Sequence, residues 1–134
     1  MAPGEKPDGG VIYPTLTCFD DAFEIVLGIA QENKGRAWKL VIVHALCLFP
    51  DEKLAAHAWV EEGTKVYFAG MYLGEKTFFQ VERPEYYAQV RPQEMTRYRV
   101  AEIFRGKKAG DRMHTGPWEP GYQPYLRDAQ KEER

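Results

Sequence analysis

Two side chains in this sequence could act together as a nucleophile and its base. Cys18 follows Thr17 at the predicted start of a helix, where unpaired backbone N–H groups and the positive end of the helix dipole favour a thiolate. His57 lies in a later apolar run that is typical of a strand. An imidazole close to the thiol could take its proton and pass it to a leaving group. Cys18 and His57 are therefore the predicted catalytic residues.

The hydrophobic pattern predicts the elements that must position these two side chains. Apolar residues recur every three or four positions over residues 19–30, so we expect a helix that ends near Asn33. A second, short helix is expected at residues 84–89, with Pro84 in its first turn. Five runs predict strands: residues 38–48, 54–61, 65–69, 77–81 and 97–104. The predicted fold class is α+β, with one N-terminal helix packed on an antiparallel sheet of about four to five strands.

Side chains alternate along the strand that carries His57. His57 and Trp59 therefore share one face of the sheet, and the small Ala56 and Ala58 share the other. The small residues would let the helix lie close to the sheet. If the helix begins near the middle of this strand, Cys18 and His57 would come within hydrogen-bonding distance.

A cysteine at a helix start and the later string His-Ala-Trp-Val-Glu at residues 57–61 resemble the transglutaminase-like branch of the papain-like cysteine peptidase superfamily. The resemblance covers about residues 15–70. It implies that Cys18 is the nucleophile and His57 the base of a hydrolase or acyl transferase that acts on an amide or thioester. In that superfamily an Asp or Asn on the following strand orients the imidazole. The matching stretch, residues 66–70, has no acid or amide, and the nearest candidates lie later: Glu75, Gln80 and Glu82.

In an alternative interpretation, the protein has the same fold but no catalytic activity. A non-catalytic module could hold a peptide or protein partner in a cleft lined by Trp59, Tyr67 and Tyr72. The same three aromatic residues would bind the substrate of an enzyme. In the alternative, Cys18 is a small buried residue at a helix start, and His57 is a sheet histidine bonded to a backbone carbonyl. The sequence leaves both interpretations open.

The C-terminal tail offers another candidate surface. Residues 116–125 hold three prolines and three aromatic residues, which excludes a regular helix or a central strand and predicts an extended segment. Its rings either lie against the domain as a strap or dock a partner through Trp118, Tyr122 and Tyr125. We expect residues 1–10 to form a flexible lead-in, residues 11–105 a single α+β domain, and residues 106–134 an extended, partly mobile tail.

Composition and charge limit the remaining function classes. The chain has 134 residues and a net charge of −2, so we expect neither a nucleic-acid partner nor attraction to an anionic membrane. No apolar run is long enough for a membrane span and no secretory signal is recognisable, which predicts a cytoplasmic protein. Cys47 is expected in the core, and His44 as a bonded polar residue in its strand. Without a C-x-x-C or H-x-x-x-H pattern, we expect no metal, and no motif indicates a cofactor.

Overall fold

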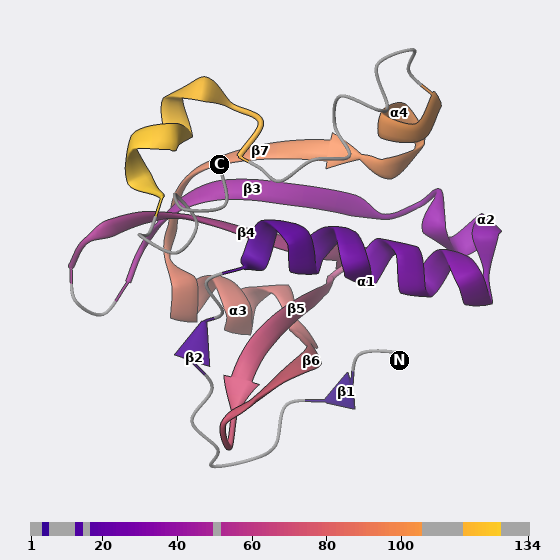
Figure 1. The fold of residues 1–134 in the computed structure, drawn as a ribbon, viewed down its shortest axis with the longest axis horizontal. Coiled ribbons are helices and arrows are strands. Elements are labelled where there is room, and N and C mark those ends of the chain that lie inside the picture. The colour runs from indigo at the N-terminus through magenta and orange to yellow at the C-terminus, as the bar shows by residue number, and fades with distance from the viewer. Residues whose placement is uncertain (1–3, 6–12, 15–16, 50–51, 106–116, 127–134) are drawn as a thin grey trace.

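The computed structural model (Figure 1) describes residues 4–5, 13–14, 17–49, 52–105 and 117–126. Five antiparallel strands form the sheet: β3 (Val41–Leu48), β4 (Leu54–Glu62), β5 (Lys65–Tyr72), β6 (Glu75–Glu82) and β7 (Pro92–Arg99). Their spatial order is β6-β5-β4-β3-β7. Two short strands, β1 (Gly4–Glu5) and β2 (Tyr13–Pro14), pair with β6 and β5. The predicted α+β class is confirmed.

Helices cover both faces of the sheet. The helical elements are α1 (Cys18–Glu32), α2 (Lys34–Ala37), α3 (Arg83–Val90), α4 (Val100–Arg105) and the 3-10 helix η2 (Pro120–Tyr125). The face under α1 buries one cluster of apolar side chains, and the face under α3 buries a second. We call these the α1-face cluster and the α3-face cluster. Since strand residues point alternately to the two faces, neighbours along a strand belong to different clusters.

The first helix follows its sequence pattern closely. Its buried side is made of residues spaced three and four apart, and its last residue is Glu32. The side chain of the next residue, Asn33, accepts a hydrogen bond from the Arg36 backbone N–H as α2 begins. The Thr17 hydroxyl does not cap the helix backbone. It donates instead to the Asp21 carboxylate at 2.9 Å. Small residues of β4, among them Ala58, lie beneath α1 and let the helix approach the strands.

β4 and β5 separate soon after the turn that joins them. They pair over only three residue positions, from Glu62 with Lys65 to Val60 with Tyr67. Farther along β5, β2 takes the position beside Gly70 that β4 would hold in a regular sheet. Figure 1 shows β5 and β6 turning away from the direction of β3 and β4. His57 therefore lies in a part of β4 that is paired with β3 and is separated from β5.

The predicted last strand is wrong in its position. A strand was expected over residues 97–104, but β7 ends at Arg99 and the chain continues as α4. The physical reason is the length of its neighbour: β3 begins at Val41, which pairs with Arg99, so a residue beyond Arg99 has no strand partner there. The tail also departs from a continuous extended chain, because η2 forms a 3-10 turn in which the Tyr122 backbone N–H donates to the Glu119 carbonyl.

The contact between α1 and β4 predicts a strong effect of side-chain volume. Ala58 is 3% exposed under α1, so Ala58→Leu should lower the free energy of unfolding by about 1–3 kcal/mol through overpacking. Ala88→Leu is the matched control, because Ala88 is exposed on α3 and should change stability by less than about 0.5 kcal/mol. Urea denaturation measures both. Equal stability of the two variants would contradict the close packing of α1 on β4.

Candidate functional site

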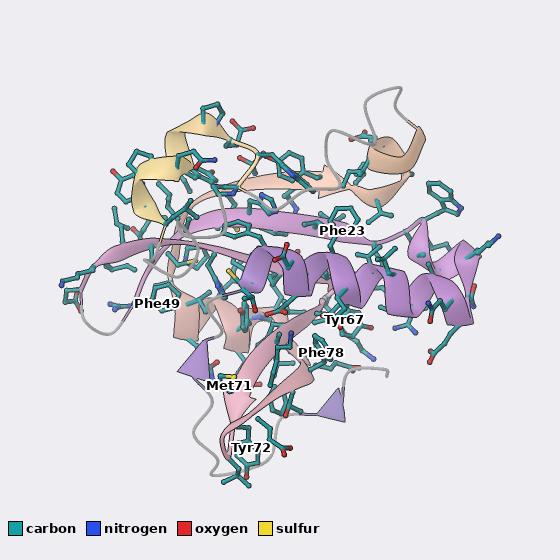
Figure 2. All side chains as sticks on the ribbon, viewed as in Figure 1. Phe23, Phe49, Tyr67, Met71, Tyr72 and Phe78 are labelled. Carbon is teal, nitrogen blue, oxygen red and sulfur yellow. The ribbon has the colours of Figure 1, made fainter. Side chains whose placement is uncertain are left out.

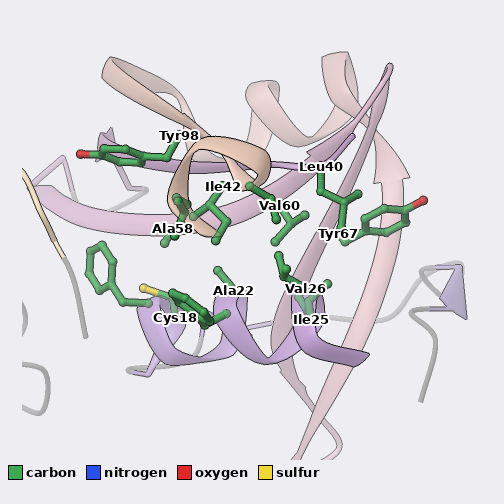
Figure 3. Packing of buried hydrophobic residues seen from close by; sticks show 14 of the residues in the cluster. Cys18, Ala22, Ile25, Val26, Leu40, Ile42, Ala58, Val60, Tyr67 and Tyr98 are labelled. Atoms are coloured by element: carbon green, nitrogen blue, oxygen red, sulfur yellow. The ribbon is translucent and has the colours of Figure 1, made fainter. Parts of the chain in front are cut away.

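Cys18 is the first residue of α1. Its side chain is 3% exposed and belongs to the α1-face cluster. Figure 3 shows it on the side of the helix that faces the strands, in the region of Ala58. The thiol therefore has the helix N-terminus that the sequence predicts, and it is covered by apolar side chains.

His57 points to the other face of the sheet. It is also 3% exposed, and its ring packs against Phe49 and Trp59 at centroid distances of 5.6 Å each. Its Nε2 lies 2.7 Å from the hydroxyl oxygen of Tyr86, which comes from α3. Cys18 and His57 thus pack with different clusters, and the structure does not place them on one shared face.

Tyr86 packs between β4 and β5 on the α3 face and is hydrogen-bonded to His57. Its ring packs against Trp59 of β4 at 5.3 Å and against Phe68 of β5 at 4.6 Å, so it bridges the two strands where they separate. Burial raises the pKa of Tyr86 well above its ordinary value of 10.0, and the charges of Cys47 and Cys18 raise it further.

The partner of His57 is a residue that the sequence interpretation missed. The acids and amide considered after the His57 strand lie on β6, and Glu82, for example, accepts a hydrogen bond from Thr64 instead. Tyr86 comes from the next element, a short helix that was predicted only as a helix. No motif signals its role, because a phenol is not the group that the family pattern uses at this position.

A buried ion pair holds the first turn of α1. Asp21 is 1% exposed, and its carboxylate accepts hydrogen bonds from Lys76 Nζ at 2.9 Å and from the Thr17 hydroxyl. The hydrogen bond to Asp21 raises the pKa of Lys76 above its ordinary value of 10.5. A carboxylate next to Cys18 would oppose thiolate formation, and Lys76 offsets its charge.

The three aromatic residues predicted to line a cleft do not come together. Trp59 is fully buried on the α3 face and donates its indole N–H to Glu61 at 2.8 Å. Tyr67 is 1% exposed in the α1-face cluster, and its hydroxyl donates to Glu62 at 2.6 Å. Tyr72 lies at the far end of β5 from Tyr67 (Figure 2). The predicted cleft is wrong, because alternation along the strands sends Trp59 and Tyr67 to opposite faces.

A second buried carboxylate was not predicted as an organising group. Glu61 is 1% exposed, and its Oε1 forms ion pairs with Arg83 and Arg97. Its Oε2 accepts hydrogen bonds from the Trp59 indole N–H and from the Tyr87 hydroxyl. Burial and this hydrogen bond raise the pKa of Tyr87. The carboxylate thereby joins β4 to α3 and to β7, and it is paired with two arginines whose side chains are partly exposed.

The described part of the tail, residues 117–126, packs against the domain and is called the C-terminal strap here. The Trp118 ring lies 4.4 Å from that of His44. Tyr122 is 6% exposed, and its hydroxyl lies 3.1 Å from the Thr96 hydroxyl. Tyr125 is 38% exposed. Of the three predicted partner-docking residues, Trp118 and Tyr122 are therefore engaged within the chain, which agrees with the strap interpretation.

No family model, no curated protein and no solved structure matches this chain. Within the described ranges, no group of three or more His, Cys, Asp or Glu side chains is placed to hold a metal ion. A helix with the length and apolarity to cross a membrane is likewise absent from the part of the chain that the structure describes. Function is therefore inferred from the contacts of Cys18, His57 and Tyr86.

A charged network at α2 predicts how stability depends on pH. The hydrogen bond from Arg36 lowers the pKa of Glu62 below its ordinary value of 4.5. A carboxyl group whose pKa is lower in the folded state than in the unfolded state stabilises the fold at pH values above its unfolded-state pKa. This stabilisation is lost as the pH falls through the folded-state pKa. Glu62→Gln should therefore flatten the loss of stability between about pH 5 and pH 3. Denaturation across that range tests this, with Glu94→Gln on exposed β7 as the control; equal slopes in both variants would contradict it.

Proposed function

We propose that this chain is a small transglutaminase-like cysteine hydrolase or acyl transferase that acts on an amide or thioester. Cys18 is the nucleophile and His57 is its base. The single observation that carries the proposal is the Tyr86 hydroxyl, 2.7 Å from Nε2 of His57. It supplies an orienting partner for the imidazole, which the sequence pattern lacked. Tyr86 is thus a positioning residue, and it comes from a helix where the family pattern has a strand.

The hydrogen bond to Tyr86 holds the His57 ring at Nε2. Which atom donates depends on the tautomer of the imidazole; when Nε2–H donates to the Tyr86 oxygen, the proposed role of base falls to Nδ1. A tyrosine hydroxyl can also donate, so it fixes the tautomer less strictly than a carboxylate does. It also brings no negative charge to stabilise the imidazolium. We therefore expect slower turnover than in an enzyme whose histidine is held by a carboxylate.

The opening of the sheet supports an approach of the two residues from opposite faces. α1 packs on β4 and β5 from one side, and α3 packs on β5 and β6 from the other. Tyr86 packs against both strands where they separate and is hydrogen-bonded to His57. Side chains from the two faces of a regularly paired sheet would be kept apart by the backbone between them.

The proposed reaction has two stages. The Cys18 sulfur forms a bond to the carbonyl carbon while the thiol proton passes to His57. The carbon–nitrogen bond of an amide, or the carbon–sulfur bond of a thioester, then breaks, and His57 protonates the leaving group. Water or an amine attacks the acyl-enzyme, passes a proton to His57, and releases the acid or the transferred amide as the thiol re-forms.

A non-catalytic peptide- or protein-binding module is the second candidate. One observation favours it: Cys18 and His57 are each only 3% exposed, so a substrate would have to displace side chains to reach them. In this alternative the hydrogen bond between His57 and Tyr86 is structural and satisfies two buried polar groups. The two candidates predict different thiol chemistry.

The reactivity of Cys18 separates them. In a Cys47→Ala background, the rate of alkylation by iodoacetamide should follow a pH profile with a midpoint below about pH 8.5, the value for an ordinary thiol. Tyr86→Phe should raise that midpoint, because His57 loses its orienting partner, whereas His57→Ala should remove the activation. Tyr125→Phe, at an exposed tyrosine, is the matched control and should leave the midpoint unchanged. A midpoint at or above that of an ordinary thiol in the parent protein would reject the enzyme and favour the binding module.

The ion pair at the first turn of α1 gives an independent test. Lys76→Met leaves the Asp21 carboxylate without its cation, and the negative charge should raise the midpoint of the Cys18 profile by about one pH unit or less. Lys39→Met, at an exposed lysine, is the control and should have no effect. The same alkylation assay measures both variants. If Lys76→Met leaves the midpoint where it was, Asp21 and Lys76 do not influence the thiol.

A further inference from the structure

We propose that the C-terminal strap occupies a peptide-binding surface over the first turns of α1, and that the ligand of this surface is a peptide with an aromatic residue followed by an acidic one. The strap thereby blocks the approach to Cys18. This inference deepens the proposed function, on which it rests for the statement that the bound peptide is a substrate.

The strap binds through one side only. Its inward side chains are buried or half-buried, and three of them are spaced four residues apart (Trp118, Tyr122 and Leu126). Pro117 and Glu119 flank Trp118 and are also buried or half-buried. The side chains between Tyr122 and Leu126 are exposed. Tyr122 and Leu126 belong to the same cluster as Cys18. The segment is therefore attached to the α1 face as a bound peptide would be, with an inner row of anchors and an outer row in solvent.

Trp118 is the central anchor of the strap. Its ring packs against His44 at 4.4 Å, against Tyr98 at 4.7 Å and against Phe23 at 6.1 Å. Its backbone N–H donates to Nδ1 of His44 at 3.4 Å. Rings on two strands and on α1 thus surround one indole, and such a set of aromatic contacts selects a flat, bulky side chain.

The residue after Trp118 adds a polar requirement. The Tyr98 hydroxyl donates to the Glu119 carboxylate at 3.2 Å, and a second hydroxyl pair, Thr96 with Tyr122, lies at 3.1 Å. A peptide with an aromatic residue followed by Glu could replace the strap in two contacts: the ring contacts of Trp118 and the hydrogen bond from Tyr98 to Glu119. The specificity of the surface therefore follows from Trp118 and Glu119, which this chain itself supplies.

A continuous row of rings connects the anchor to the first turn of α1. Phe19, the residue after Cys18, packs against His44 at 4.7 Å, and His44 in turn packs against Trp118. Phe23 lies one helical turn later and also contacts Trp118. η2 contacts β3 and β4, the strands under α1, as its position beside them in Figure 1 shows. Release of Trp118 would remove its contacts with His44 and Phe23 beside the first turns of α1, and in this proposal it uncovers the thiol.

Attachment within one chain favours the strap over a separate peptide. A tethered segment has an effective concentration on the order of millimolar, so a free peptide competes poorly until the anchor is weakened. Trp118→Ala weakens the anchor and leaves the rest of the surface in place. Tyr125→Ala is the matched control, because it removes an aromatic ring from the same segment at an exposed position.

The test measures alkylation of Cys18 by iodoacetamide in the Cys47→Ala background at one pH. Trp118→Ala should raise the rate about tenfold or more, since local opening becomes easier, and Tyr125→Ala should change it less than about twofold. A synthetic peptide of residues 117–126 should restore protection of Trp118→Ala in a saturable way, and the same peptide with Ala at the Trp position should not. Equal rates in the two variants, or no protection by the peptide, would overturn the inference.

Two further measurements separate the possible causes. In a Cys18→Ala background, Cys47 lies in the α3-face cluster and reports general unfolding. If Trp118→Ala exposes Cys47 as much as Cys18, the strap is a general stabilising element and the inference fails. Tyr122→Phe, which removes only a hydroxyl, is a milder variant and should raise the Cys18 rate by a smaller factor. If strap release exposes a thiol whose pH midpoint is ordinary, the peptide surface stands and the enzyme proposal fails.

Discussion

The separation of β4 from β5 is the constraint on which the rest of this structure depends. After three paired positions the strands part, and the space between them has to be filled from both faces. α1 covers one side with a row of apolar residues, and α3 inserts Tyr86 from the other. β2 supplies the strand contact that β5 would otherwise lack at this point.

Buried polar groups hold the parted strands and the helices in place. Removal of a polar group from water is unfavourable unless it finds a hydrogen-bond partner, so each such group fixes the position of that partner. Asp21 and Lys76 connect α1 to β6. Glu61 connects β4 to β7 through Arg97 and to α3 through Tyr87. These contacts join elements that the main-chain ladder of the sheet leaves unconnected.

The same arrangement explains why the candidate site is closed. Cys18 and His57 each take part in the packing of a face, and the C-terminal strap adds a further layer over the α1 face. A site of this kind needs a movement that exposes the thiol without loss of the core. The strap is suited to such a movement, because it does not belong to the sheet and is attached mainly through its side chains. In the proposed function, access to the thiol and binding of a peptide are therefore one event.

The sequence by itself determined the first helix, the succession of strands and the face that His57 shares with Trp59, because these follow from local periodicity. It also placed Cys18 at a helix start. The end of β7 could not be predicted, since it depends on where β3 begins. Nor could the partner of His57, because Tyr86 lies 29 residues away along the chain and reaches it only after α3 packs on the sheet. Only the tertiary structure decided that Trp59 and Tyr67 form no common cleft. Alternation tells which residues of one strand share a face, but strand pairing and helix packing decide which faces of different strands lie together.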